Sequence, residues 1–337
     1  MTMSDTQVAI IGAGPVGLYA AFYARLRGLD VTVVDSLSSS GGQVAHLYPQ
    51  KELLDIPGFV SIDGQQLTQQ LYQQAAQLAP HFKFNTTVTD VRYDEADAQF
   101  TLVTDQGELT AQKVILAIGR GAFEPKRLPN DLGAAYEGDG VYYVADDLQK
   151  FAGRDVLVAG GGDSAVDQAL ALEPIANQVY LTHRRDNFRA MAYTLDQLAT
   201  SNVRMLTPFS ISEIERVDEK LVVQLMGADA TDSVVVDDLI VSYGFRSDAQ
   251  LVEAWTSHPK IERQHCVVAR TMETTVPGLY AVGDIAGYPG KTDLIATGFG
   301  EAPLAIHDIL MQLAPENAGP LHSSGFTIKD GQIDQLK

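Results

Sequence analysis

The chain has a single cysteine, Cys266, among its 337 residues. A disulfide within the chain is therefore excluded, and so is any chemistry that needs two thiols of one chain. Positive charge is also scarce, because 24 Lys and Arg stand against 43 Asp and Glu, a formal net charge of −19. This balance argues against nucleic acid or an anionic membrane surface as the main partner.

Long apolar runs are missing as well, and no stretch is a candidate for a membrane span. The first residues, Met1 to Asp5, lack the basic and apolar regions of a signal peptide. We therefore expect a cytoplasmic protein. The length favours two domains, each with enough residues for its own core. No short repeat or low-complexity tract is present, but a larger nucleotide-binding unit occurs twice.

The first of these units runs from Gln7 to Asp35. An apolar strand leads into Gly-Ala-Gly-Pro-Val-Gly, and a helical pattern and a second apolar strand follow. Gly12 permits the tight turn, Gly14 lets backbone approach a pyrophosphate, and Gly17 lets the helix pack close to the strand. A carboxylate at Asp35 accepts from both ribose hydroxyls and rejects a 2′-phosphate. We expect FAD or NAD here, held by Gly12, Gly14, Pro15, Gly17 and Asp35.

The second unit begins with the apolar strand Asp155 to Ala159, which leads into Gly-Gly-Gly-Asp-Ser-Ala. The acid expected after the next strand is missing, and a cluster of arginines takes its place. Arginine forks pair with phosphate oxygens, so this pattern favours NADPH over NADH. The alternative is a solvated basic face. The candidate residues are Gly160, Gly162, Asp163, Ser164, Ala165, His183, Arg184, Arg185 and Arg189.

Between the two units, the pattern predicts a loop over 36–43 and further loop segments over 47–51 and 55–59. It predicts a helix over 67–78 and strands over 82–84, 88–93, 99–104 and 114–119. Towards the end of the chain, the stretch from Thr292 continues as a helix to Leu313.

One predicted site selects an unmodified ribose and the other a ribose with a 2′-phosphate. This combination suggests a flavin that stays bound and a nicotinamide dinucleotide that binds and dissociates, linked by hydride transfer. Taken in order, the motifs resemble those of the low-molecular-weight thioredoxin reductase family over nearly the whole chain. The motifs that carry this resemblance are Gly12 to Gly17, Gly41-Gly42-Gln43, Ala117-Ile118-Gly119, Gly160 to Ala165, His183-Arg184-Arg185 and Thr275 to Asp284.

One departure from that family is decisive. Thioredoxin reductases carry a redox Cys-x-x-Cys just before the second Gly-rich strand, whereas the corresponding stretch here, Gly140 to Asp147, has no thiol. Cys266 alone cannot supply an attacking and a resolving sulfur. Electrons on the flavin must therefore leave directly to an external acceptor. In this respect the chain resembles the thioredoxin-reductase-like ferredoxin–NADP reductases of bacteria (type 2).

The resemblance implies further flavin contacts. Tyr48 would stack on one face of the flavin and His322 would cover the other, while Asp284 would bind the ribityl chain or the pyrophosphate edge. The helix after Thr292 would turn its N-terminal amides towards the flavin edge that gains negative charge on reduction. No side chain is needed as an acid or base for hydride transfer, and no metal is implied. The implied FAD contacts are Asp35, Gly42, Gln43, Tyr48, Val88, Phe123, Asp284 and Ser324.

The resulting fold class is α/β, with two Rossmann-like dinucleotide-binding domains and the NADPH domain inserted into the FAD domain. We place the FAD domain at 1–119 and 247–337 and the NADPH domain at 120–246, with crossings near Arg120 and near Phe245 to Ser247. Two extended crossings can act as a hinge.

The expected reaction moves electrons between NADPH and ferredoxin or flavodoxin, through hydride transfer to flavin N5 and single-electron transfer to the acceptor. Since such partners are acidic, we expect a local basic patch drawing on Lys51, Lys126, Arg127 and Arg154. The resemblance also implies a homodimer. Two alternatives stay open: a reductase of quinones, free flavins or other small acceptors, and a redox-sensing binding protein that turns over slowly.

Overall fold

The computed structural model describes residues 4–121, 125–145, 147–244, 249–319, 326–329 and 332–335. The chain divides into two compact units, the first formed by Met1–Ala122 with Ser247–Lys337 and the second by Phe123–Arg246. Phe123, His322 and Ser324, and the crossing at 245–247, lie outside the described residues. Each unit is described by itself.

The first unit is built on a sheet whose strand order is β5-β2-β1-β8-β7-β6, with β19 also paired to β8. The strands β1, β2, β5, β8 and β19 pair in parallel, whereas β6, β7 and the first half of β8 form an antiparallel meander. The bounds are β1 (Thr6–Ile11), β2 (Val31–Val34), β5 (His81–Lys83), β6 (Val88–Asp94), β7 (Gln99–Thr104), β8 (Gly107–Leu116) and β19 (Leu279–Ala281).

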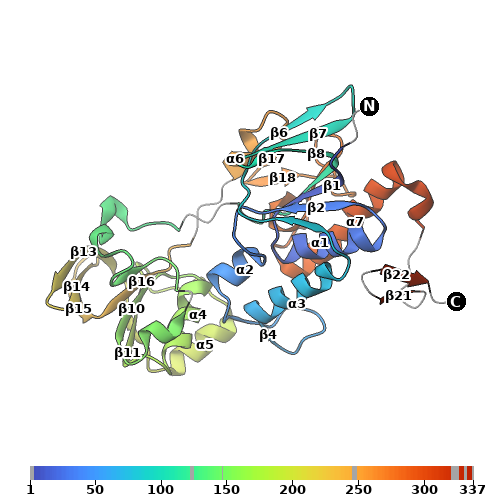
Figure 1. Ribbon diagram of the computed structural model, residues 1–337. Coiled ribbons are helices and arrows are strands. Elements are labelled where there is room, and N and C mark those ends of the chain that lie inside the picture. The colour runs from blue at the N-terminus through green and yellow to red at the C-terminus, as the bar shows by residue number, and fades with distance from the viewer. Residues whose placement is uncertain are drawn as a thin grey trace. The chain divides into compact units, whose positions relative to one another are not determined.

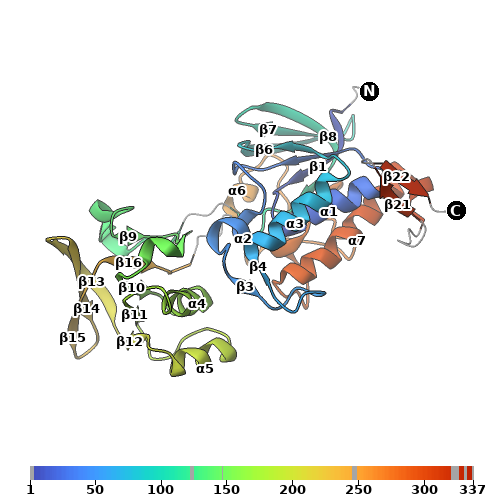
Figure 2. The same cartoon turned by 60° about the horizontal axis from the view of Figure 1, so that its bottom comes forward.

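Helices α1, α3 and α7 cover one face of this sheet, and α1 lies between the other two (Figures 1 and 2). Their apolar side chains, such as Leu18, Leu71 and Ile306, join those of the sheet in one core. The helix α3 begins where the Asp63 carboxylate accepts a hydrogen bond from Gln66 N–H at 2.7 Å, an N-cap of the usual kind. The bounds are α1 (Pro15–Leu26), α3 (Gly64–Ala76) and α7 (Ile295–Leu313).

Shorter elements complete the first unit. A helix that the sequence did not predict, α2, begins at Gly42, inside the segment predicted as loop. Gly41 turns the chain into this helix with φ of +112°, and the helix buries the side chain of Val44. The remaining elements are α2 (Gly42–Leu47), β3 (Glu52–Leu53), β4 (Ile62–Asp63), α6 (Ala249–Glu253), β17 (Ile261–Glu262), β18 (His265–Val267), the 3₁₀ turn η4 (Gly283–Ile285), β20 (Ala286–Gly287), η5 (Pro315–Asn317), β21 (Phe326–Lys329) and β22 (Gln332–Gln335).

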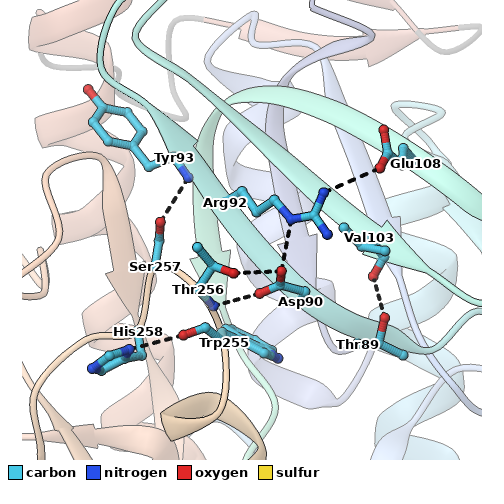
Figure 3. Close-up of polar contacts among 10 residues, drawn as sticks. All are labelled: Thr89, Asp90, Arg92, Tyr93, Val103, Glu108, Trp255, Thr256, Ser257 and His258. Atoms are coloured by element: carbon cyan, nitrogen blue, oxygen red, sulfur yellow. Dashed lines mark hydrogen bonds and ion pairs between the residues drawn. The ribbon is translucent and has the colours of Figure 1, made fainter.

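The outer edge of β6 is covered by the segment that follows α6 (Figure 3). Thr256 N–H and Oγ1–H donate to the two carboxylate oxygens of Asp90 at 2.6 and 2.8 Å. Ser257 N–H donates to Val91 O at 2.8 Å, and Ser257 Oγ accepts from Tyr93 N–H at 2.9 Å. These contacts satisfy backbone groups that an edge strand would otherwise expose. The returning chain is thus tied to the meander.

The second unit has a parallel sheet in the order β12-β11-β10-β16-β9 and an antiparallel sheet β13-β14-β15. Successive side chains of β10 point to opposite faces of the parallel sheet. Val158 packs with side chains of α4 in one hydrophobic core, and Leu157 packs with side chains of β14 in another. The bounds are η1 (Pro129–Asp131), η2 (Ala134–Tyr136), β9 (Val141–Tyr142), η3 (Leu148–Phe151), β10 (Asp155–Ala159), α4 (Asp163–Leu172), β11 (Gln178–Thr182), α5 (Ala192–Thr200), β12 (Arg204–Leu206), β13 (Ser210–Val217), β14 (Lys220–Met226), β15 (Thr231–Val236) and β16 (Asp238–Val241).

A search of the helices in the described parts of the chain finds none that is both long and apolar enough to cross a membrane.

Candidate functional site

The first Gly-rich turn, between β1 and α1, is too tight for side chains. Gly12 has φ of +106°, and a Cβ there would lie 2.5 Å from Ala117 O. A Cβ at Gly17 would lie 1.9 Å from Gly12 O, which places the first turn of α1 directly against the strand end. Both glycines therefore do what the motif predicts for them.

The N-terminus of α1 is open. Gly14 is its N-cap residue and Pro15 its first helical residue, and among the described residues no side chain caps the first turn. A Cβ at Gly14 would meet nothing in the described chain closer than Gly42 Cα, at 4.0 Å. The free backbone N–H groups of a helix start attract anions, and the helix dipole adds to this attraction. The turn thus offers a cradle that fits a pyrophosphate.

A second loop closes on this turn. Gly41 N–H donates to Ala13 O at 2.8 Å, and a Cβ at Gly42 would lie 2.9 Å from Gly14 Cα. Gly42 itself has φ of +54°. Gln43 lies beside the end of β8, because a Cβ at Gly119 would come within 3.2 Å of Gln43 Nε2. The predicted residues Gly14, Gly42 and Gln43 are therefore neighbours.

Asp35 follows β2 and points back to the same turn. Its Oδ2 accepts from Ala13 N–H at 2.6 Å and its Oδ1 accepts from Leu37 N–H at 2.8 Å. Burial raises the pKa of the Asp35 carboxyl, while the hydrogen bonds from Ala13 and Leu37 and the nearby His46 work in the opposite direction. Each carboxylate oxygen can accept more than one hydrogen bond, so capacity for ribose hydroxyls remains.

Tyr48 and Asp284 lie near each other in the first unit. Burial raises the pKa of Tyr48 to about 12, with further contributions from the charges of Asp284 and Asp55. The Lys51 ammonium lies 5.8 Å from the centre of the Tyr48 ring. Tyr48 is half-buried at the end of α2, so its phenol stays neutral and the ring can serve as a flat surface. Val88, half-buried, begins β6.

Asp284 lies in η4, directly after Gly283, which has φ of +74°. Burial raises the pKa of the Asp284 carboxyl, and the charges of Asp293 and Glu301 raise it further. Arg120 and Lys291 oppose them. Arg120 also forms an ion pair with Asp293. These charged residues around Asp284 had no signal in the sequence, because tertiary contacts bring them together.

The second Gly-rich turn, between β10 and α4, is equally tight. A Cβ at Gly160 would lie 2.4 Å from Ser242 O, and one at Gly161 would lie 2.3 Å from the His183 ring. Gly162 is the N-cap residue of α4, and no side chain of the described residues caps this helix start. The Cβ of Ala165, which is fully buried, would lie 2.8 Å from a Cβ added at Gly160, so a small residue is also needed at position 165. Ser164 is exposed in the first turn.

The arginines lie beside this turn. Arg189 N–H donates to Gly161 O at 2.7 Å, which fixes the arginine loop to the glycines. Asp163 accepts from Met191 N–H at 2.9 Å and holds the far end of the same loop. Burial, together with the charges of the three arginines, lowers the pKa of His183. In the part of the chain that the structure describes, no ion pair involves the exposed side chains of Arg184, Arg185 and Arg189.

Cys266 takes no part in either site. It lies in β18 with 0% of its surface exposed. Burial raises the pKa of its thiol to about 12, so the reactive thiolate is not formed near neutral pH. A redox disulfide is therefore not available to this chain.

Solved structures show which class this fold defines. The chain matches thioredoxin reductase from Lactococcus lactis with a TM-score of 0.77 at 24% identity, over 91% of this chain and 98% of that one. It matches thioredoxin reductase from T. acidophilum with a TM-score of 0.80 at 23% identity, over 92% and 99%. At these identities the likeness shows the fold alone, a thioredoxin reductase-like α/β fold, and the predicted fold class is confirmed.

The sequence itself matches the pyridine nucleotide-disulphide oxidoreductase family over residues 6–307. The chain therefore belongs to this family and is an oxidoreductase. It is 43% identical over 321 residues to "Ferredoxin--NADP reductase 2" of Latilactobacillus sakei, covering 95% of this chain and 97% of the relative. It is 44% identical over 323 residues to "Ferredoxin--NADP reductase" of Halalkalibacterium halodurans, covering 95% and 97%. The resemblance predicted from the motifs is confirmed.

Proposed function

We propose that this chain transfers electrons between NADPH and ferredoxin through FAD, as the names of its relatives indicate for them. The observation that carries the proposal is the contrast between the two Gly-rich turns. The first ends in the half-buried carboxylate of Asp35, whereas the second is flanked by exposed arginines. One turn suits an unmodified ribose and the other a 2′-phosphate.

In the first unit, the open start of α1 holds the pyrophosphate and Asp35 holds the adenosine ribose. Gly42 and Gln43 lie against the same turn, and Tyr48 and Asp284 would line the part of the site beyond it. Bound FAD would supply the redox chemistry, which is uptake of a hydride and release of single electrons. The protein's work is to position this group and set the charge around it.

In the second unit, the start of α4 takes the NADPH pyrophosphate, and the guanidinium groups take the 2′-phosphate. Their exposure leaves all three arginines free to move onto a phosphate. His183, packed on Gly161 with a lowered pKa, adds a neutral ring rather than another charge.

The acceptor must take electrons without thiol chemistry, since Cys266 is buried and has no partner cysteine in the sequence. A ferredoxin or a flavodoxin satisfies this requirement. Two of the four cations in the predicted docking patch already have acidic partners: Arg127 donates to both oxygens of Glu137, and Arg154 pairs with Asp238. The positive charge available to an acidic partner is therefore smaller than the sequence suggests. A homodimer and a cytoplasmic location stay predictions.

The test is anaerobic stopped-flow spectroscopy of the purified flavoprotein with NADPH and with NADH, followed by oxidised ferredoxin. We expect NADPH to bleach the flavin much faster than NADH, and ferredoxin to restore its colour at catalytic rates. If only quinones or free flavins restore the colour, the acceptor is a small molecule instead. If NADPH does not reduce the bound flavin, the redox-sensing alternative replaces the enzyme.

A further inference from the structure

A buried ion pair lies directly behind the Asp284 turn. Glu301, on α7, and Lys291 approach to 2.5 Å, and their side chains are 3% and 6% exposed. The same Glu301 oxygen, Oε1, accepts from Tyr288 Oη–H at 2.7 Å. The other oxygen, Oε2, accepts from the backbone N–H of Gly283 at 2.6 Å. One carboxylate thus joins the helix, the loop before it and the turn that carries Asp284.

Stability alone gives no reason for this pair. Removing two charges from water costs several kcal/mol per ion, and apolar residues of the same volume often serve equally well in such places. The chain nevertheless places a Glu and a Lys where a Leu and a Met would fill the space. The pair therefore calls for a task that an apolar pair could not perform.

The position of Glu301 indicates that task. Gly283 has φ of +74°, and its N–H is held by Glu301 Oε2. The start of α7 packs tightly on this turn, because a Cβ at Gly298 would lie 3.2 Å from Gly283 Cα and 2.4 Å from Val16 Cγ2. The next residue in the chain, Asp284, is thereby fixed relative to the starts of α1 and α7.

The two charges also act on Asp284 in opposite directions. Burial and Asp293 raise the pKa of the Asp284 carboxyl, Arg120 and Lys291 lower it, and Glu301 raises it. Without Lys291, the cluster of Asp284, Asp293 and Glu301 would hold three carboxylates against Arg120 and the His265 ring, whose Nε2 lies 3.8 Å from Asp293. Negative charge beside a flavin disfavours its reduced, anionic form.

We propose that Glu301 and Lys291 are positioning residues of the FAD site: Glu301 fixes the Gly283 N–H and so the Asp284 carboxylate, and Lys291 cancels the charge that Glu301 brings. This inference rests on the proposed function, since it takes Asp284 to face the flavin. An apolar pair could fill the space but could not hold the Gly283 N–H.

The experiment compares the holoprotein with Glu301→Gln, Lys291→Met and the double variant. The two-electron midpoint potential of the flavin is measured by photochemical reduction against reference dyes, without NADPH. Glu301→Gln leaves a positive charge and raises the potential, whereas Lys291→Met leaves a negative charge and lowers it. Each single change is expected to shift the ratio of reduced to oxidised flavin about tenfold, or ~30 mV.

The double variant restores neutrality, so its potential returns towards that of the wild type. Its FAD affinity stays reduced, because the neutral amide that replaces the Glu301 carboxylate holds the turn less strongly. A matched control leaves the potential unchanged: Asp308→Asn, which removes a charge further along α7. A single variant that does not fold leaves the double variant as the test, since it contains no unpaired charge.

If both single variants shift the flavin potential in the same direction, the pair is merely structural. The same conclusion follows if the potential does not change and only the melting temperature falls. A double variant that keeps wild-type FAD affinity would overturn the role of Glu301. Because the reduction is photochemical, these outcomes are independent of NADPH. A wild-type flavin that NADPH fails to reduce would count against the proposed function alone.

Discussion

The carboxylate of Asp35 accepts a hydrogen bond from the backbone N–H of Ala13, at 2.6 Å, so the acid after the second strand is tied to the Gly-rich turn after the first. The turn and the ribose-binding acid are therefore one structural unit. A ligand that displaces either one must disturb the other.

Asp35→Asn should weaken FAD binding. The amide loses one acceptor oxygen and its charge, and a hydrogen bond to a charged group contributes about 1.5–3 kcal/mol. We expect the dissociation constant for FAD to rise roughly 10- to 100-fold, measured by the fluorescence of released flavin. Asp97→Asn, at an exposed turn of the same unit, is the control. If the two variants bind FAD with equal affinity, Asp35 does not contribute to the FAD site.

Gly42→Ala tests the close approach of the second loop. The added Cβ would lie 2.9 Å from Gly14 Cα at a residue with φ of +54°. Gly58 has φ of +95° and no described atom within 4 Å of its added Cβ, so Gly58→Ala measures backbone strain without a steric clash, about 1–2 kcal/mol. We expect Gly42→Ala to lower both the melting temperature and the retention of FAD, and Gly58→Ala to leave FAD retention unchanged. Similar FAD loss in both would contradict a cradle at Gly14.

Arg185→Ala should reduce the preference for NADPH. Loss of a charge-assisted phosphate contact is expected to raise the KM for NADPH about tenfold and to leave the KM for NADH nearly unchanged. The effect should fade at high salt, since the guanidinium is exposed. Arg204→Ala is the matched control, because that exposed guanidinium lies over the Tyr180 ring, 5.9 Å from its centre. If both cofactors weaken equally, the arginine does not read the 2′-phosphate. The same assay on Arg184→Ala and Arg189→Ala would show how much each of the three arginines contributes to the preference for NADPH over NADH.

Both Gly-rich turns could be predicted from the sequence because strand, glycines and helix are consecutive, and each glycine answers a local steric need. Ala165 and the arginine loop follow from the same local order. The structure agrees with these steric predictions. A Cβ added at Gly12, Gly17 or Gly160 would overlap a backbone atom, and the one at Gly160 would also overlap the Cβ of Ala165.

Contacts between distant segments had no such local signal. Glu301 meets Gly283 across 18 residues, and Arg120 meets Asp293 across 173. Small residues made the segment around Gly42 resemble a loop, yet burial of Val44 turns it into the helix α2. Propensity is a weak guide when tertiary packing decides.

Asp90 gives the fold a dependence on pH that the sequence did not suggest. It accepts both hydrogen bonds of Thr256 and one from Arg92 Nε at 2.9 Å (Figure 3). Burial opposes ionisation, but these donors outweigh it and lower the pKa of the Asp90 carboxyl. A carboxyl with a lowered pKa in the folded state stabilises the fold above its unfolded value of about 3.9. That stabilisation is lost as the pH falls through the lower, folded value.

Asp90→Asn should therefore lower the melting temperature at pH 7, since the amide cannot accept all three hydrogen bonds; the expected cost is about 1–3 kcal/mol. The difference from the wild type should shrink as the pH falls below about 3.9, because the carboxyl is protonated first in the unfolded state, and it should vanish only below the lower pKa of the folded state. Calorimetry of both proteins from about pH 7 down to pH 3 measures it. A difference that is constant over this range would mean that the Asp90 charge does not hold the segment after α6. Asp97→Asn, again the control, should follow the wild type throughout.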